Sequence, residues 1–213
     1  MEFSTLLDIV GNEPLFGTDI LLAGDVCPAD IQRQLSRWVT AGKVYQLRRG
    51  LYTLAPPYQK IVPHPFLVAN RLQPGSYISL QSALAFYGLI PERVSVTTSV
   101  TTGRPGKLTN PLGEFDFRHI QVNWLRAYRQ VDLGNDQKAF VATPEKALLD
   151  LVYLVPGSDT AEYLKELRLQ TLDQLDLNQM QQLSLGSNKL KLIRAVEAIQ
   201  QMAKEEQAGY GSL

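Results

Sequence analysis

The stretch that decides the fold of this chain runs from residue 29 to residue 54 and reads ADIQRQLSRWVTAGKVYQLRRGLYTL. Its first half predicts a helix over residues 29–41, because apolar residues recur there at helical spacing and form one face. These residues are Ile31, Leu35, Trp38 and Val39. Pro28 suits the first turn of such a helix, and Gly42 suits the left-handed position that ends it.

The opposite face of this helix is polar and is formed by Arg33, Ser36, Arg37 and Thr40. After Lys43, alternating residues predict a β-hairpin of residues 44–48 and 51–54, with a turn at Arg49-Gly50. Arg48 and Arg49 then lie at its tip. A helix with free arginines followed by a basic hairpin is typical of a winged helix-turn-helix, in which the helix enters the major groove and the wing touches the backbone.

Composition places the chain among soluble globular proteins. It has 213 residues, of which 45% are hydrophobic and 20% charged. This length suits one large domain or two small ones. No stretch approaches the roughly 20 apolar residues of a membrane span, and the N-terminus lacks the pattern of a signal peptide. The single cysteine, Cys27, excludes an internal disulfide and fits a reducing compartment, so a cytoplasmic protein is expected.

Charge is segregated along the chain although the formal net charge is zero. Residues 1–30 hold six acidic and no basic residues, residues 31–130 hold 13 basic against three acidic, and residues 131–213 hold eight against twelve. A basic middle region on a neutral chain favours a local anionic partner, double-stranded DNA above all. The alternative is that the acidic residues fold back onto the basic face and neutralise it.

The sequence predicts an α+β protein with two domains. Three helices, over residues 3–10, 18–24 and 29–41, close with the hairpin into a winged helix of residues 1–55. Thr18 is expected to cap the second of these helices and Gly24 to end it. Proline-rich segments at residues 55–58 and 63–65 indicate a linker. Residues 60–213 are expected to form a mixed domain with a small sheet and a helical C-terminal half.

The elements expected in this second domain follow from local patterns. Strands are predicted over residues 77–78, 94–102, 115–119, 121–125 and 138–142. Helices are predicted over residues 66–72, 79–87 with Ser79 as cap, and 143–154, where a proline stands in the first turn. Further helices follow, and the last begins near Ser187 with Leu190, Ile193, Val196 and Ile199 on its apolar face.

Cations with a candidate role in DNA binding occur in three places: the helix, the hairpin and a later turn. The turn, Gly103-Arg104-Pro105-Gly106-Lys107, lacks the spacing of a phosphate loop and is interpreted as a hairpin turn that offers a second backbone contact. For the helix arginines, the alternative is an ordinary solvated face. With two hydroxyl residues of the same helix face added, the full set of candidate DNA-binding residues is Arg33, Ser36, Arg37, Thr40, Lys43, Arg48, Arg49, Arg104 and Lys107.

No group of residues in the sequence predicts an active site, a metal site or a cofactor site. His64 and His119 are far apart, with no carboxylate or cysteine at ligand spacing. Glu145-Lys146 does not match the acid-x-Lys arrangement with which metal-dependent nucleases hold a cation. We therefore expect a protein that is not an enzyme. The competing hypotheses are a nuclease-like enzyme targeted by the winged helix and a pure protein-interaction module.

Several segments, taken together, resemble the AbiEi family, the antitoxins of type IV abortive-infection toxin–antitoxin systems. They are KVYQLRRGLY at 43–52, LVANRL at 67–72, GSYISL at 75–80, SAL at 82–84, YGLIPE at 87–92, VTT at 96–98 and TPEKALLDL at 143–151. The resemblance spans roughly residues 5 to 200, and its most specific parts are the Arg-Gly-Leu-Tyr and Pro-Glu-Lys-Ala segments.

This resemblance implies a division of labour between the two domains. The N-terminal winged helix would bind operator repeats and repress its own operon. The C-terminal antitoxin domain would neutralise a toxin of nucleotidyltransferase type, without a stable complex being required. Some relatives of this kind are free-standing regulators without a toxin, and that alternative stays open.

Overall fold

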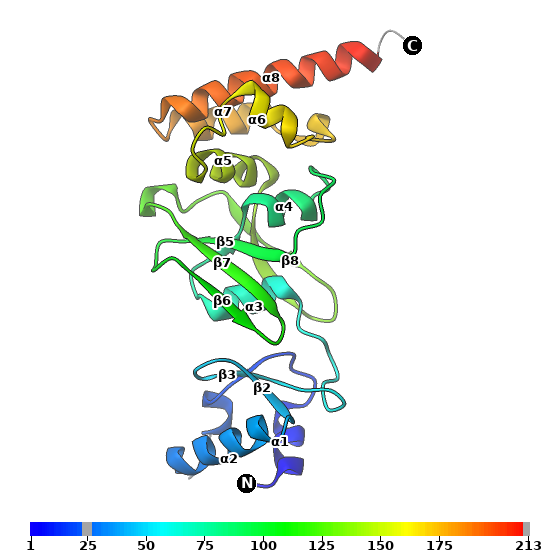
Figure 1. Cartoon of the computed structure of the whole chain (residues 1–213), viewed down its shortest axis with the longest axis vertical. Helices are drawn as coiled ribbons and strands as arrows, with labels where there is room; N and C mark the ends of the chain where they lie inside the picture. Colours follow the sequence, from blue (N-terminus) through cyan, green and yellow to red (C-terminus); the bar gives the residue numbers. More distant parts are fainter. Residues whose placement is uncertain (23–26, 211–213) are drawn as a thin grey trace.

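The computed structural model describes residues 1–22 and 27–210, with side chains described up to residue 205. These residues form a mixed α+β protein with eight α-helices and two β-sheets (Figure 1). The first sheet has three strands in the order β1-β3-β2, and the second has six in the order β6-β7-β5-β4-β9-β8. The expected α+β class is therefore confirmed, but the sheet of the second part is larger than expected.

In the N-terminal part, residues 1–22 and 27–55 form two α-helices, a short 3₁₀ helix and the three-stranded antiparallel sheet. Its elements are α1 (Phe3–Val10), β1 (Phe16–Gly17), the 3₁₀ helix η1 (Asp19–Leu21), α2 (Pro28–Thr40), β2 (Val44–Arg48) and β3 (Leu51–Leu54). The predictions of the first helix, the third helix and the hairpin are thus confirmed.

The second predicted helix is wrong in extent. Up to residue 22, where the described stretch ends, the segment forms only the single turn of η1. Its N-cap residue Thr18 makes no side-chain cap hydrogen bond, and Ile20 is exposed. The reason is that residues 16–17 pair with β3, so the chain enters this segment as a strand and turns only briefly. The expected helix end at Gly24 lies outside the described residues.

Strand β2 is irregular at its centre. Gln46 pairs with Tyr52 and Arg48 pairs with Leu51, so Leu47 is an extra residue that forms a bulge. Val44 and Leu47 are both buried, but in different hydrophobic cores, so both faces of β2 are covered and the predicted alternation holds as far as Leu47.

The second part is built on the six-stranded mixed sheet. Its strands are β4 (Tyr77–Ile78), β5 (Val96–Thr101), β6 (Gly106–Asn110), β7 (Gly113–His119), β8 (Tyr128–Asp132) and β9 (Lys138–Ala142). The β4–β9 and β5–β7 pairs are parallel, and the other pairs are antiparallel.

Helices cover both faces of this sheet and continue into a helical C-terminal region. They are α3 (Pro65–Leu72), α4 (Leu80–Phe86), α5 (Pro144–Leu154), α6 (Ala161–Glu166), α7 (Leu177–Leu185) and α8 (Leu190–Tyr210). Two more 3₁₀ helices, η2 (Val122–Trp124) and η3 (Leu172–Gln174), lie between them in the chain. Figure 1 shows α3 on the side of the sheet that faces the N-terminal part, and α4 and α5 on the other side.

Two local predictions for the second part are wrong, and a third is confirmed only in part. The segment predicted as a strand at residues 121–125 contains the 3₁₀ helix η2 instead, because the Trp124 indole turns into the core and donates to Asp150. Ser79 is the N-cap residue of α4, as predicted, but it makes no side-chain cap bond, since its hydroxyl donates to Asp150. Leu190 is 72% exposed, and Leu192 takes its place in the core.

The described residues form two hydrophobic cores, and the hairpin contributes to both. The smaller core joins α1, α2 and the three-stranded sheet through side chains that include Leu6, Leu35 and Trp38. The larger core fills the second part and extends to Leu47 and Leu51 of the hairpin. The tip of the hairpin is therefore packed between the two parts.

Candidate nucleic-acid interface

Helix α2 is held by its apolar face, so its polar face is free. Ile31, Leu35 and Trp38 are all buried, and the Trp38 ring packs edge-on against Phe3 with centroids 5.4 Å apart. The helix ends in a Schellman motif, in which the Lys43 amide donates to the Trp38 carbonyl and the Gly42 amide donates to the Val39 carbonyl. Gly42 has a φ of 68°, and this turn leads the chain directly into β2.

All four residues predicted on the polar face of α2 are exposed, but they differ in their surroundings. The Arg33 guanidinium forms an exposed ion pair with Asp30, one helical turn earlier. Asp30, in the first turn of α2, therefore neutralises part of the positive charge on the polar face of this helix. The Thr40 hydroxyl donates to the Ser36 carbonyl at 3.0 Å. Arg37 has no ion-pair partner among the described residues.

A groove of about 590 Å³ lies between α2 and the hairpin. It brings together three predicted residues, Ser36, Thr40 and Arg49. Its other lining residues are Thr18, Gln32, Val39, Gln46, Gly50 and Tyr52. Gln32 lies one helical turn before Ser36, so helical periodicity was enough to predict that Gln32 lies on the same face of α2. Thr18 reaches the groove through the pairing of β1 with β3, which has no local signal in the sequence.

The two arginines at the hairpin tip have different surroundings. The Arg49 side chain is exposed and lines the groove. The Arg48 guanidinium instead donates to the Arg71 carbonyl, through Nη2 at 3.2 Å, at the C-terminal end of α3. A cation at that end of a helix is stabilised by the free carbonyls and the helix dipole. Arg48 therefore joins the N-terminal part to the second part.

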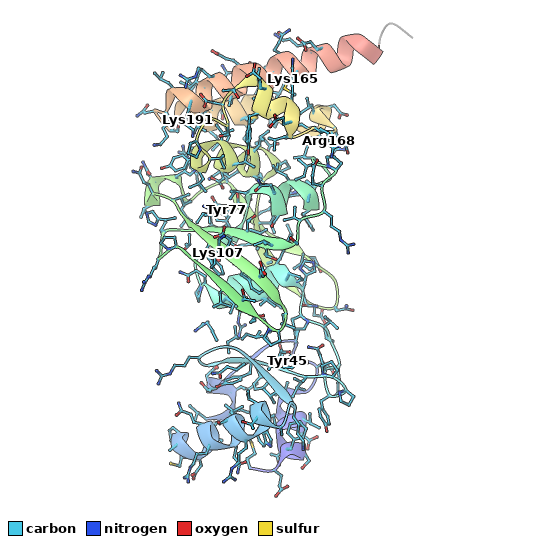
Figure 2. All side chains as sticks on the ribbon, viewed as in Figure 1. Tyr45, Tyr77, Lys107, Lys165, Arg168 and Lys191 are labelled. Carbon is cyan, nitrogen blue, oxygen red and sulfur yellow. The ribbon has the colours of Figure 1, made fainter. Side chains whose placement is uncertain are left out.

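The remaining predicted cations lie outside the groove. The Lys43 ammonium lies over the Phe3 ring, 4.6 Å from its centroid, and the residue is half-buried. Arg104 and Lys107 are exposed on the β5–β6 turn and on strand β6 of the large sheet. Figure 2 places Lys107 in the sheet-bearing part, beyond the hairpin that carries Tyr45 as seen from α2. The structure therefore does not bring this turn to the surface formed by α2 and the hairpin.

Burial affects one phenol in the groove. Tyr52 is buried, its ring stacks against Phe16, and its hydroxyl accepts a hydrogen bond from the Gln46 side chain at 3.3 Å. Burial raises the pKa of Tyr52, although the Gly50 backbone and the Arg49 charge oppose this shift. The groove thus offers one cation and several neutral donors and acceptors, which suits a polar, anionic surface.

A second polar cluster, which the sequence did not predict, is centred on Asp150 in the core of the second part. Its carboxylate accepts hydrogen bonds from Trp124 Nε1 at 2.7 Å, Ser79 Oγ at 2.7 Å and Tyr77 OH at 3.0 Å, and it pairs with the Lys146 ammonium. Burial lowers the pKa of Lys146, and burial together with Asp150 raises the pKa of Tyr77.

This Asp150 cluster is closed to solvent, since Lys146 and Asp150 are both 0% exposed. Its hydrogen bonds and ion pair join β4, η2 and α5. Glu145 is also buried, and its carboxylate accepts the Asp176 amide at 3.0 Å. Among the described residues, no group of three or more His, Cys, Asp or Glu side chains is placed to hold a metal ion.

Comparison with known proteins gives no family: no protein-family model matches the chain, and no curated protein matches it. No helix in the described part of the chain combines the length and the apolar character needed to cross a membrane. Arguments about function therefore start from the geometry described above.

Proposed function

We propose that the protein is a sequence-specific DNA-binding transcriptional repressor, with residues 1–55 as a winged helix-turn-helix. The order of elements supports this proposal: α1, β1, η1, α2, β2 and β3 follow one another, and β3 lies between β1 and β2 in the sheet. In such a unit, η1 and α2 correspond to the helix-turn-helix pair, α2 to the recognition helix and the β2–β3 hairpin to the wing.

The observation that carries the proposal is the groove between α2 and the hairpin. Ser36 and Thr40 form its helix side, and Arg49 lies on its hairpin side. A duplex that places its major groove over α2 would bring base edges to this stripe and to Arg37, and would bring a phosphate strand to Arg49. Arg48 is not part of this proposed surface, because its guanidinium is bound to the Arg71 carbonyl.

We further propose that the repressor is the antitoxin of a type IV toxin–antitoxin pair, acting against a nucleotidyltransferase-type toxin. This step rests on the resemblance of the segments at residues 43–52 and 143–151 to the AbiEi family. The alternative of a targeted nuclease has little support, since Glu145 and Asp150 are buried and engaged in hydrogen bonds. A neighbouring gene that encodes such a toxin, and whose toxicity co-expression of this protein relieves, is the result expected.

The experiment for DNA binding compares Arg37→Ala and Arg49→Ala in salt titrations with operator and random duplexes. We expect Arg37→Ala to weaken operator binding by about 1–3 kcal/mol, because a base contact is lost. The difference in affinity between the operator and the random duplex should therefore become smaller. We expect Arg49→Ala to weaken both duplexes alike and to reduce the salt slope by about one unit, because a phosphate contact is lost.

Arg93→Ala is the matched control for this experiment, since Arg93 is an exposed arginine of the second part. It should leave both affinities and the salt slope unchanged. If Arg37→Ala and Arg49→Ala behave like this control, α2 and the hairpin are not the DNA-binding surface and the proposed function is wrong.

A further inference from the structure

A second concavity, of about 330 Å³, lies in the sheet-bearing part and shares no residue with the groove beside α2. It is bounded by α3, by the segment before β4 and by the edge of the large sheet. Its lining residues are Leu67, Asn70, Arg71, Pro74, Gly75, Ser76, Tyr128, Lys138 and Phe140. The proposed DNA surface makes no use of it.

One wall of this concavity is aromatic and exposed. Tyr128 and Phe140 are 39% and 43% exposed, and their rings meet edge-on with centroids 5.9 Å apart. Tyr128 stacks in parallel on the buried Tyr77 at 4.6 Å, and Tyr77 is in turn held by the Asp150 carboxylate. The wall is therefore rigidly supported from behind while its front is open to solvent.

The rest of the lining is polar and carries positive charge. Arg71 and Lys138 are exposed, and neither forms an ion pair among the described residues. Glu13 and Asp136 line an adjoining concavity together with Arg71 and Lys138, but the lining of this one contains no acidic residue. The site is thus complementary to a negative charge placed beside an aromatic ring.

Ser76 supplies an unused polar group in this lining. The residue is only 4% exposed, and its hydroxyl has no hydrogen-bond partner among the described residues. A buried hydroxyl without a partner is unfavourable, so a ligand atom that reaches it would gain affinity. Asn70 makes the lining rigid, because its side chain accepts the Phe140 amide at 2.6 Å and donates to the Ser76 carbonyl at 3.2 Å.

We propose that this concavity binds a small planar aromatic anion. The ring packs against Tyr128 and Phe140, and the anionic group lies between Arg71 and Lys138. An aromatic carboxylate and a nucleoside monophosphate share this chemistry. Such a site joins apolar packing to a few fixed polar groups, as small-molecule sites do.

The test is isothermal titration of the full-length protein with 2-naphthoate and with AMP, each beside its neutral counterpart, 2-naphthamide or adenosine. We expect saturable one-to-one binding of at least one anion, with its neutral counterpart about tenfold weaker. The anion that binds more tightly shows whether the natural ligand is an aromatic carboxylate or a nucleoside monophosphate. If AMP is the anion that binds, inorganic phosphate alone should bind more weakly than AMP. Equal and saturable binding of phosphate and AMP would overturn the aromatic part of the proposal.

Variants assign the binding to this concavity. Lys138→Gln and Arg71→Gln should each weaken the bound anion about three- to tenfold, and both change only exposed side chains. Phe140→Ser should weaken it through the loss of ring packing. Lys107→Gln is the matched control, because Lys107 is an exposed lysine on the opposite edge strand, β6. Absence of saturable binding, or equal binding by the Lys138, Arg71 and Lys107 variants, would overturn the proposal.

Discussion

At the scale of single residues, Asp150 carries the most concentrated set of interactions in the second part. Its carboxylate is fully buried and is bonded to Lys146, Trp124, Ser79 and Tyr77. A buried charge keeps its place only when its partners satisfy it, since desolvation otherwise exceeds the Coulombic gain. Lys146 and Asp150 are therefore expected to depend strongly on one another.

We predict that Asp150→Asn and Lys146→Met each lower the free energy of unfolding by about 3–5 kcal/mol, because each leaves one buried charge unpaired. The double variant leaves no unpaired charge, so it should lose clearly less than the sum of the two single losses. Urea unfolding of the four proteins measures this coupling.

The Arg194–Asp159 ion pair is the control for this cycle, because Arg194 is exposed. Arg194→Gln should cost less than about 1 kcal/mol, as exposed ion pairs do. Additive losses in the Lys146/Asp150 cycle would show that the two charges are not coupled in the folded state.

At the scale of elements, helix α3 has a titratable cap. Its N-cap residue is His64, whose Nδ1 accepts the Phe66 amide at 3.1 Å. Burial lowers the pKa of His64 below its ordinary value of 6.5. Only the neutral imidazole can accept this hydrogen bond. Because the folded-state pKa is the lower one, the contribution of His64 is complete above pH 6.5 and is lost as the pH falls through the folded-state pKa.

We predict that His64→Asn makes stability less sensitive to acid. Asparagine is a good N-cap residue and does not titrate in this range. The free energy of unfolding, measured by urea at pH 7.5 and at pH 5, should fall more in the natural protein than in His64→Asn. His119 is present in both proteins and cancels in the difference. An equal fall in both proteins would show that the cap does not titrate in this range.

The same scale shows which elements the sequence was able to predict. Helix α2 and strand β9 were predicted because burial of one face imposes a spacing on their apolar residues. Helix α5 is buried on all sides over residues 145–152 and was predicted instead from the proline in its first turn. The edge strands β6 and β8 were missed, since they are largely exposed and carry no such alternation. Residues 121–125 were misassigned as a strand because the position of Trp124 depends on Asp150, 26 residues away.

The candidate DNA surface was predictable in part, for a related reason. Ser36, Thr40 and Arg49 belong to local patterns, so the helix and hairpin assignments were enough to bring them together. The docking of Arg48 on Arg71, 23 residues later, depends on how the two parts pack. The concavity at Tyr128 and Phe140 likewise joins α3 to the sheet edge, which no local pattern reveals.

At the scale of the whole molecule, the hairpin couples the two parts. Figure 1 shows it between α2 and the large sheet. Leu15, Leu47 and Leu51 belong to the larger core and are each at most 5% exposed. Arg48 adds its hydrogen bonds to the end of α3. The proposed DNA-binding unit, residues 1–55, therefore has an apolar surface that the second part covers.

The last prediction concerns a fragment of residues 1–58, which we expect to bind DNA through α2 and Arg49 but to be less stable than the intact chain. Leu47→Ser makes the reason measurable. In the intact chain it should cost about 2–5 kcal/mol, as loss of a buried leucine does. In the fragment the same side chain has lost its packing partners in the second part, so the cost should be much smaller.

Leu35→Ser is the control for that comparison, because Leu35 is 1% exposed and packs within the smaller core. This substitution should lower the free energy of unfolding by about the same amount in the fragment and in the intact chain. Urea unfolding, followed by circular dichroism, measures the loss of unfolding free energy for each of the two substitutions in the fragment and in the intact chain. If Leu47→Ser costs as much in the fragment as in the intact chain, the hairpin packs only within residues 1–58. The second part would then contribute nothing to the stability of the proposed wing.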